Sequence, residues 1–340
     1  MKIFSHLLLA IVLYGFLSCS ARQETITTRI PSDVFNSLNS IPASEVLISF
    51  PKDSIILATV LRDSLLCILF KPENTFKNTL SIESINHRNQ NLLTIPYGDG
   101  TGEMMLPLFS HQDSSILLYD LVLNKTAVIR IEDLILNEIY EPEFYSTNII
   151  TQEIIPDYKK RRFIYLNQYS YNGKEPRFLY SDPRGNQHER KRSYYYFNVC
   201  IGKLVQHPHT HRIAYLGQSQ PSLELMDEKG HLIRRIIFPR EHQEVTDIRY
   251  GNITDYIFVA PVINCFTAAT ANDQFIAGAY ETDDHKYYIL IFLWDGTLIG
   301  GFRTTSQVIY LSLSTNGNSF YCWETKDSID VLTKYSYSCD

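Results

Sequence analysis

The chain has 340 residues, of which 44% are hydrophobic and 20% are charged. This composition excludes general disorder, and the length allows one large domain or two ordinary ones. The formal net charge of −6 gives no reason to expect a nucleic-acid partner. The 23 tyrosines and 18 phenylalanines, together with many β-branched residues, favour β-strands.

The first residues have the order of an export signal. Lys2 gives a positive start, residues 7–17 are almost wholly apolar, and the small Ser18 follows. The apolar run is too short for an ordinary membrane-spanning helix. Residues 1–18 are therefore expected to be a signal peptide.

Cys19 follows this segment directly. The stretch Phe16-Leu17-Ser18-Cys19 resembles the lipobox of bacterial lipoproteins, with Phe16 in place of the usual aliphatic residue. The resemblance implies that Cys19 becomes the lipid-modified first residue of the mature chain, with residues 19–24 as a tether and residues 25–340 as one domain. A cleaved secretory signal, with Cys19 merely nearby, is the alternative. We expect an exported protein on the periplasmic or surface side of an outer membrane, held there by the lipid on Cys19.

The five other cysteines lie far apart in the chain. No C-x-x-C pair occurs, so neither a zinc knuckle nor a small disulfide scaffold is indicated. Cys67, Cys265 and Cys322 lie in apolar runs and are expected to be buried free thiols. A disulfide in an oxidising compartment is the alternative.

Short apolar runs, bounded by turn residues, recur at intervals of roughly 45 to 60 residues. Six such runs are found, at residues 65–70, 116–119, 163–166, 213–216, 275–278 and 320–323. This period is typical of four-stranded propeller blades, so we predict an all-β, six-bladed β-propeller of antiparallel blades. Two β-sandwich domains are the competing architecture, which would show denser strand spacing and a linker.

Three turns share an aspartate-to-glycine pattern: residues 182–185, 227–230 and 295–296. Aspartate can accept backbone hydrogen bonds at the start of a tight turn, and glycine tolerates the positive φ at its end. We predict that these turns join equivalent strands of three blades.

Two further expectations concern the longest interval and the end of the chain. Residues 239–264 are predicted to form an extended loop on one face, which makes them a candidate contact surface. After residues 320–323 there is room for only about one more strand. An early segment near residues 25–30 is therefore predicted to pair into the last blade and close the ring.

The segment Tyr97-Gly98-Asp99-Gly100-Thr101-Gly102-Glu103, followed by the strand-like residues 115–120, carries a family resemblance. It resembles the G-x-G-P-x-E segment after the first blade of TolB-like six-bladed propeller lipoproteins of Bacteroidales-type bacteria, a group with NHL-like blades. Thr101 stands where the family has proline. Residues 213–237 and 288–302 extend the likeness over nearly all of the mature chain. The resemblance implies a fold and a lipid anchor but no particular activity.

Two clusters of residues could carry chemistry. The glycines of residues 98–102 have the wrong spacing for a dinucleotide-binding loop, so an inter-blade turn is expected there. His207, His209 and His211 are the candidate metal ligands, because alternating histidines in an extended segment can share one side. Pro208 interrupts any regular strand at this point, and a solvated turn is the favoured interpretation.

Other catalytic signatures are absent from the sequence. It contains no G-x-S-x-G elbow and no H-E-x-x-H helix. Asp283, Asp284 and His285 fall between two strand-like runs and are expected to form a hairpin tip. Glu141 and Glu143 are either surface acids or part of a divalent-ion site.

The leading functional hypothesis is a non-enzymatic binding or scaffolding propeller whose loops contact a protein, peptide or glycan partner. We expect it to be a monomer without a cofactor. The alternative is a metal-dependent enzyme in the central channel, such as a lactonase-like hydrolase or a lyase. That alternative needs several inward Asp, Glu, Asn or His side chains at one mouth of the channel. Sensing of envelope components is a third hypothesis.

Overall fold

The computed structural model describes residues 26–71, 79–85, 91–100, 102–105, 107–112, 115–120, 123, 125–130, 143–146, 153–157, 162–167, 177–181, 187–191, 202–210, 212–218, 221–227, 232–239, 245–250, 253–258 and 264–337. The predicted signal peptide, Cys19 and the tether lie outside these residues. Within the described ranges, no helix is both long and apolar enough to cross a membrane.

Consecutive strands build one antiparallel sheet after another along the chain. The first sheet contains β3 (Ile55–Leu61), β4 (Leu65–Phe70), β5 (Thr79–Ser84) and β6 (Asn91–Ile95). The second contains β7 (Pro107–Gln112), β8 (Ser115–Asp120), β9 (Lys125–Arg130) and β10 (Glu143–Ser146). The third contains β11 (Glu153–Asp157), β12 (Arg162–Asn167), β13 (Arg177–Ser181) and β14 (Gln187–Lys191).

The second half of the chain continues in the same way. The fourth sheet contains β15 (Gly202–Gln206), β16 (Ile213–Gly217), β17 (Ser222–Met226) and β18 (Leu232–Ile237). The fifth contains β21 (Phe266–Ala271), β22 (Phe275–Glu281), β23 (Tyr287–Leu293) and β24 (Leu298–Thr304). The last sheet contains β25 (Val308–Leu313), β26 (Ser319–Lys326) and β27 (Ile329–Ser336), completed by a strand from the N-terminal segment.

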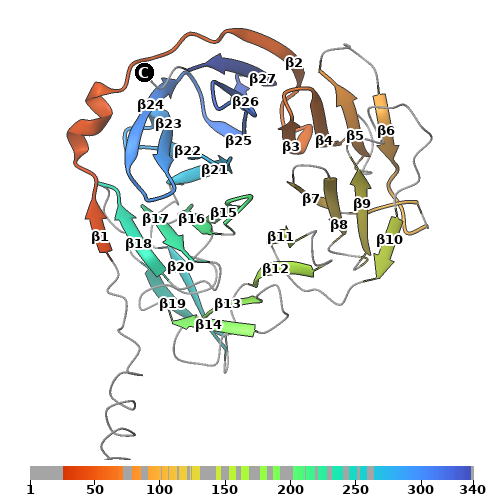
Figure 1. Cartoon of the computed structure of the whole chain (residues 1–340), viewed down its shortest axis with the longest axis horizontal. Coiled ribbons are helices and arrows are strands. Elements are labelled where there is room, and N and C mark those ends of the chain that lie inside the picture. Colours follow the sequence, from red (N-terminus) through yellow and green to blue (C-terminus); the bar gives the residue numbers. More distant parts are fainter. Residues whose placement is uncertain are drawn as a thin grey trace, which may run out of the picture.

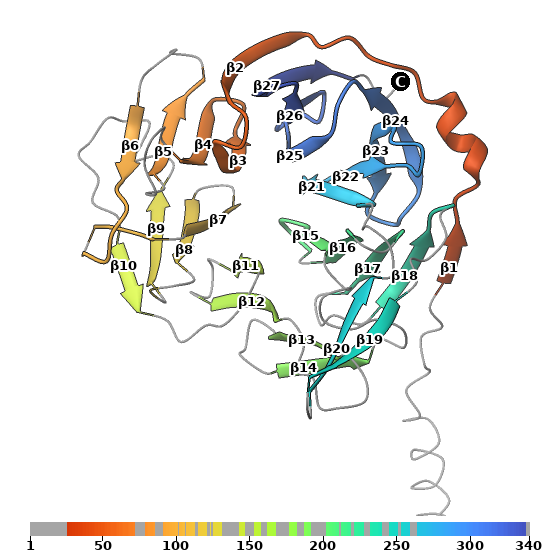
Figure 2. The ribbon, with the colours of Figure 1, turned by 180° about the vertical axis from the view of Figure 1, so that it is seen from behind.

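The sheets stand in a ring, with the first strand of each sheet innermost (Figures 1 and 2). Neighbouring sheets contact one another through these inner strands: β25 contacts β3 and β21, β15 contacts β21 and β11, and β11 contacts β7. Such a radial arrangement of four-stranded antiparallel sheets is a β-propeller, so the predicted all-β propeller fold is confirmed.

Each of the apolar runs predicted as a blade start lies on the second strand of a sheet, namely β4, β8, β12, β16, β22 and β26. A second strand has ladder neighbours on both edges, and its two faces pack against adjacent sheets. All five residues of β16 are buried, as are the first five of β4. A strand buried on both faces has a nearly continuous apolar sequence, which is why these runs were visible.

Each aspartate-to-glycine pattern lies in the connection between the third and fourth strands of a sheet, as predicted, and the turn at residues 295–296 is wholly among the described residues. In the turn between β23 and β24, the Asp295 carboxylate accepts a hydrogen bond from the Thr297 N–H at 2.8 Å. This bond lowers the pKa of the Asp295 carboxyl group. Gly296 follows with a φ of +87°, a backbone conformation that favours glycine.

Apolar clusters fill the spaces between neighbouring sheets. Between the first and second sheets, Cys67 and Leu69 pack with Ile116 and Leu118. Cys265 and Cys322 are buried in similar clusters further round the ring. Cys67, Cys265 and Cys322 are free thiols, as predicted. Burial raises the pKa of the Cys67 thiol well above its ordinary value, so this thiol is not a reactive nucleophile.

Side-chain hydrogen bonds join the last sheet to the first. The Tyr310 hydroxyl of β25 donates to the Ile56 carbonyl of β3. The Ser312 hydroxyl accepts the Val60 N–H at 2.8 Å. Trp323 of β26 packs with apolar residues of β3 and β4 in the same junction. This junction closes the ring.

The N-terminal belt, residues 26–51, runs along the outer edges of three consecutive sheets (Figure 1). It contains β1 (Ile26–Arg29), the 3-10 helix η1 (Ser32–Ser37) and β2 (Glu45–Pro51). β1 pairs in parallel with β18 of the fourth sheet. Between β1 and β2, the belt residue Ser40 forms a parallel bridge with Arg303 of β24. β2 pairs antiparallel with β27 and completes the last sheet.

An N-terminal strand completes the last blade, as predicted, but the strand is β2, so the assignment to residues 25–30 was wrong. β2 is the more apolar segment: its Leu47, Ile48 and Phe50 pack on the cluster around Trp323. In β1, Ile26 is 58% exposed, so this strand contributes little to the core.

Residues 239–264 also differ from the prediction of an extended loop. They contain β19 (Val245–Tyr250) and β20 (Ile253–Phe258), which pair as an antiparallel two-stranded sheet. The sequence alternates apolar and polar residues in part of this stretch, and that signal indicates strands. The side chains of β19 and β20 are not among those described.

Candidate functional site: a groove under the N-terminal belt

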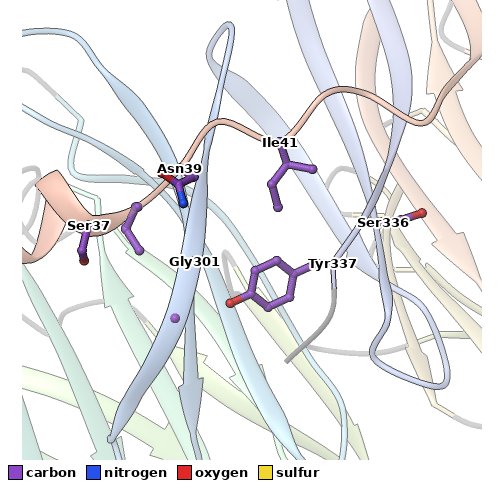
Figure 3. A pocket seen from close by; sticks show the side chains of 8 residues that line it. Ser37, Asn39, Ile41, Gly301, Ser336 and Tyr337 are labelled. Carbon is purple, nitrogen blue, oxygen red and sulfur yellow. The ribbon is translucent and has the colours of Figure 1, made fainter. Parts of the chain in front are cut away.

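A groove of about 460 Å³ opens on the outer edge of the propeller, between the belt, β24 and the end of β27 (Figure 3). The belt contributes one wall and the two sheets contribute the other, so the groove exists only because distant segments meet. Its lining residues are Ser37, Leu38, Asn39, Ile41, Gly300, Gly301, Ser336 and Tyr337. The volume lies within the range of about 300–1,000 Å³ that ligand sites usually have.

Side-chain contacts hold the belt in place beside the groove. The Phe35 ring of η1 lies 5.4 Å from the Tyr280 ring and 5.1 Å from the Tyr288 ring, between centroids. Ile41 packs against the cluster between the fifth and last sheets. The Ser44 hydroxyl donates to the Ser336 hydroxyl at 3.0 Å. The belt wall is thus fixed on both sides of the groove.

Two consecutive glycines form the floor of the groove on β24. A Cβ atom at Gly300 would lie 2.2 Å from the Tyr337 hydroxyl oxygen. A Cβ atom at Gly301 would lie 2.3 Å from the Ile289 carbonyl oxygen. At Gly301 an added side chain would meet backbone, whereas at Gly300 it would meet the movable end of the Tyr337 side chain, and both glycines leave bare backbone on the floor of the groove.

The lining of the groove is neutral. None of its eight residues carries a charge, and its polar side chains are hydroxyls and one amide. Leu38, Ile41 and the Tyr337 ring add apolar surface. The Tyr337 ring packs on Phe302 and Phe320, with centroids 5.6 and 6.1 Å away. Such a lining suits a neutral ligand with hydrogen-bonding groups better than a phosphate or a metal ion.

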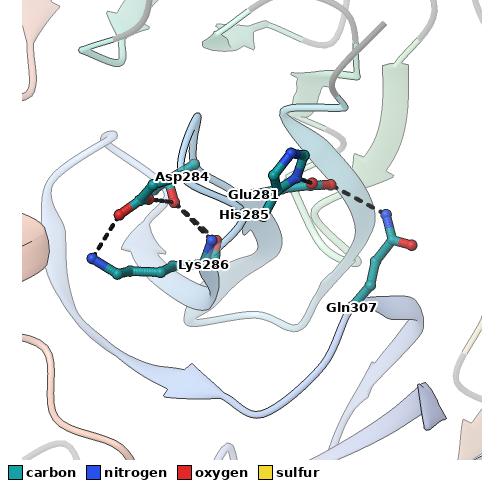
Figure 4. Close-up of polar contacts among 6 residues, drawn as sticks. Glu281, Asp284, His285, Lys286 and Gln307 are labelled. Carbon is teal, nitrogen blue, oxygen red and sulfur yellow. Dashed lines mark hydrogen bonds and ion pairs between the residues drawn. The ribbon is translucent and has the colours of Figure 1, made fainter. Parts of the chain in front are cut away.

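A second polar constellation joins the fifth and last sheets (Figure 4). The buried Glu281 carboxylate contacts His285 Nδ1 at 2.7 Å and accepts a hydrogen bond from Gln307 Nε2 at 3.2 Å. Next to Gln307, the Ser306 hydroxyl donates to the buried Glu324 at 3.3 Å. Neighbouring residues of one connection therefore bind a buried glutamate in each sheet.

The sequence did not predict this polar constellation around Glu281 and Glu324, because its residues lie on different strands and no short motif contains them. It did predict the hairpin tip, which is confirmed: residues 282–286 join β22 to β23. In that tip Lys286 pairs with Asp284 at 2.6 Å, which lowers the pKa of the Asp284 carboxyl group and raises that of the Lys286 ammonium group.

The histidine cluster predicted as a candidate metal site occupies the turn between β15 and β16. His207 Nδ1 accepts hydrogen bonds from the N–H groups of His209 and Thr210, at 3.1 and 3.3 Å. The His207 ring is buried and lies 5.0 Å from the Trp294 ring. His209 is exposed, and His211 lies outside the described residues.

The turn is therefore present as favoured from the sequence, but His207 is not solvated. It supports the turn from inside, with Nδ1 already engaged by backbone donors. Among the described residues, no group of three His, Cys, Asp or Glu side chains could hold a metal ion.

The glycine-rich segment connects β6 to β7, between the first and second sheets, as an inter-blade turn. Glu103 closes it: its carboxylate accepts the Gly100 N–H at 2.9 Å. A Cβ atom at Gly98 would lie 2.0 Å from the same carboxylate. The glycine at position 98 makes room for Glu103, which explains this part of the motif without a phosphate.

The channel-enzyme alternative requires Asp, Glu, Asn or His side chains that point into the central channel, so the composition of the inner strands tests it. β3, β15, β21 and β25 contain no Asp, Glu, Asn or His. The remaining inner strands, β7 and β11, carry His111, Glu153 and Asp157, whose side chains are not among those described. Glu141 also lies outside the described residues, and Glu143 is the first residue of β10.

Comparisons with known proteins agree with this architecture. No family model matches the chain, and no curated protein sequence matches it. Among solved structures, a supposed exported protein from Bacteroides fragilis NCTC 9343 superposes with a TM-score of 0.52 and 9% identity, over 93% of this chain and 100% of that one.

The WD40 repeats of RRP9 give a TM-score of 0.51 and 10% identity, over 87% of this chain and 99% of that one. A member of the DUF4221 family from Bacteroides vulgatus ATCC 8482 gives a TM-score of 0.48 and 12% identity, over 87% of this chain and 98% of that one. Identities at this level show the fold alone. Together with the ring of sheets, the first two likenesses establish that the chain has the fold of a β-propeller.

Proposed function

We propose that the chain is an exported, lipid-anchored β-propeller of the TolB-like, six-bladed kind. In this proposal it acts as a non-enzymatic binding module, anchored through Cys19, for a protein, peptide or glycan partner. The observation that carries the proposal is the groove under the N-terminal belt, a fixed, neutral cavity with a bare backbone floor.

Three features support the proposal. The groove walls are held by aromatic stacking and hydrogen bonds, so a ligand would meet a preorganised site. The six apolar runs fall on equivalent second strands, which supports the blade count. The likeness to a supposed exported Bacteroides protein agrees with the export signal read from the sequence.

The test uses the full chain in detergent on two arrays of defined probes, random peptides in one and glycans in the other. Ser37 lines the groove and is exposed, so Ser37→Trp should fill it. Asn36 is exposed on the same 3-10 helix but does not line the groove, so Asn36→Trp is the matched control.

We expect at least one probe to bind the wild type and the Asn36→Trp variant equally, and to bind the Ser37→Trp variant about tenfold or more weakly. Probes that bind all three proteins alike would place recognition elsewhere. If no probe binds the wild type, the groove is not a ligand site for these two classes.

A further inference from the structure

The groove also has a direction and a hydrogen-bonding pattern, which narrow what it can bind. We propose that its ligand is an extended peptide segment that adds to the outer edge of β24 as a further strand, pairing with the backbone of Gly301. This inference deepens the proposed function and rests on it, because it names the ligand class of the same groove.

The Gly301 backbone is oriented away from β23. The Arg303 N–H donates outward to the Asn39 carbonyl at 3.0 Å, away from β23. Across the β23–β24 ladder, Arg303 is paired with Tyr288 and Gly301 with Leu290. In an antiparallel ladder, residues two apart on one strand direct their N–H and C=O groups to the same side. The polar backbone groups of Gly301 therefore also point outward, into the groove that Gly301 lines.

The second step is the space beside this edge. At Ser40 the belt is in strand-pairing position next to Arg303, with parallel orientation. Two residues, Leu38 and Asn39, separate that bridge from η1, Ser32–Ser37, and neither forms a ladder pair with β24. The groove lies beside Gly301, between β24 and the belt residues Ser37 to Asn39 (Figure 3).

The third step is that the outer edges of this propeller already accept added strands. β1 pairs in parallel with the outer strand β18 over four residues, from Ile26↔Arg234 to Arg29↔Ile237. The belt repeats this orientation at Arg303. A peptide at Gly301 would continue along the same edge, so it would extend an interface that the chain itself makes. Strand addition of this kind obtains affinity from main-chain hydrogen bonds.

The fourth step is the absence of side chains at the pairing position. Gly301 carries no side chain of its own, so a peptide backbone can pair with it at the ladder distance of about 4.8 Å, beside the Tyr337 hydroxyl that lies over Gly300. The Tyr337 hydroxyl and the Asn39 amide border the same space. Because no lining residue is charged, the expected peptide side chains are small or apolar rather than ionic.

The experiment exploits a feature of the sequence: Gly301 is the only glycine preceded by another glycine. Full chain made with glycine labelled at both the carbonyl carbon and the nitrogen therefore gives one amide signal with a labelled preceding carbonyl, that of Gly301. Its hydrogen exchange can be followed without any other assignment.

The probe is an acetylated, amidated pentapeptide selected from a random library on the immobilised full chain. In the free protein the Gly301 amide should exchange fast, because it has no ladder partner on β23. At saturation with the pentapeptide its exchange should slow by about tenfold or more. N-methylation at alternate peptide positions should weaken binding by about tenfold at one set of positions and little at the other.

The Ser37→Trp variant should lose the effect on Gly301 exchange, and Asn36→Trp should keep it. Equal tolerance of N-methylation at every position, or a Gly301 amide that does not respond to a bound peptide, overturns the inference. It is also overturned if no pentapeptide binds at about 1 mM. If a glycan then binds in a manner sensitive to Ser37→Trp, the proposed function stands and only the ligand class is wrong.

Discussion

The ring of Phe35 stacks on the ring of Tyr280, with centroids 5.4 Å apart and planes inclined by only 11°. Phe35 lies on the N-terminal belt, and Tyr280 lies on the second strand of the fifth sheet. This contact fixes the 3-10 helix that forms one wall of the groove. The 3-10 helix is therefore packed against the core of the propeller, with Phe35 partly buried.

Phe35→Ala should lower the free energy of unfolding by about 2 kcal/mol, because it removes two aromatic contacts from a partly buried site. Urea unfolding followed by tyrosine fluorescence measures the change. Asn36→Ala, at an exposed position of the same 3-10 helix, should change it by less than about 0.5 kcal/mol. Equal effects of the two substitutions would contradict the stacking as the source of stability.

Gly301→Ala should destabilise the protein by about 2 kcal/mol, since the added methyl group would meet the Ile289 carbonyl oxygen at 2.3 Å and force the backbone of β24 to shift. Gly102→Ala is the control, because a Cβ atom there has nothing within 4 Å. Thermal unfolding of both variants beside the wild type checks the pair. A Gly301→Ala variant as stable as the wild type would show that the backbone of β24 can shift at little cost in stability.

Alkaline pH should weaken the junction that closes the ring. Burial, with a smaller contribution from the Asp330 charge, raises the pKa of Tyr310 to about 12 from an ordinary value of 10.0. The folded state therefore holds the phenolic proton more tightly than the unfolded state. The contribution of Tyr310 to stability is complete below about pH 10 and is lost as the pH rises from about 10 to about 12.

Urea midpoints measured between about pH 8 and pH 12 should fall less steeply for Tyr310→Phe than for the wild type. Ser312→Ala removes a hydrogen bond at the same junction but no titrating group. It should lower stability at every pH and leave the slope unchanged. A Tyr310→Phe curve parallel to that of the wild type would show that other groups govern the alkaline loss.

Metabolic labelling with a fatty acid tests the anchor. The wild type should incorporate label, Cys19→Ala should not, and Cys339→Ala should label as the wild type does, because only a cysteine at the end of the export signal is the expected acceptor. Equal labelling of wild type and Cys19→Ala would rule out Cys19 as the site of lipidation.

Much of the propeller was readable from local sequence. The second strand of each sheet is buried on both faces, so its apolar run stands out from the more polar strands around it, as in β4 and β16. The third-to-fourth turns were readable as well, since aspartate and glycine meet needs of the turn itself, as Asp295 and Gly296 show.

Pairing partners of the N-terminal segment were decided only by tertiary structure. β1 has four residues and β2 has seven, and the backbone hydrogen-bonding groups along a strand are the same whichever sheet edge the strand joins. The assignment depended on which segment could fill the cluster around Trp323, and Phe50 of β2 does so with ring centroids 5.9 Å apart. The burial of His207 was also not predictable from local sequence. The ring that lies against it is that of Trp294, which belongs to the turn between β23 and β24 of the next sheet.

The groove shows most clearly which features the sequence specifies and which ones depend on tertiary structure. Sequence by itself predicted an export signal, and it determined a β-rich body with a repeated strand pattern and the Gly300–Gly301 pair. It could not show that this pair faces the belt, because the walls come from Ser37–Ile41, Gly300–Gly301 and Ser336–Tyr337. Local hydrophobic patterns specify which residues are buried within a sheet, whereas a cavity between sheets depends on how rigid pieces meet at long range. Only the folded ring brings those three segments together.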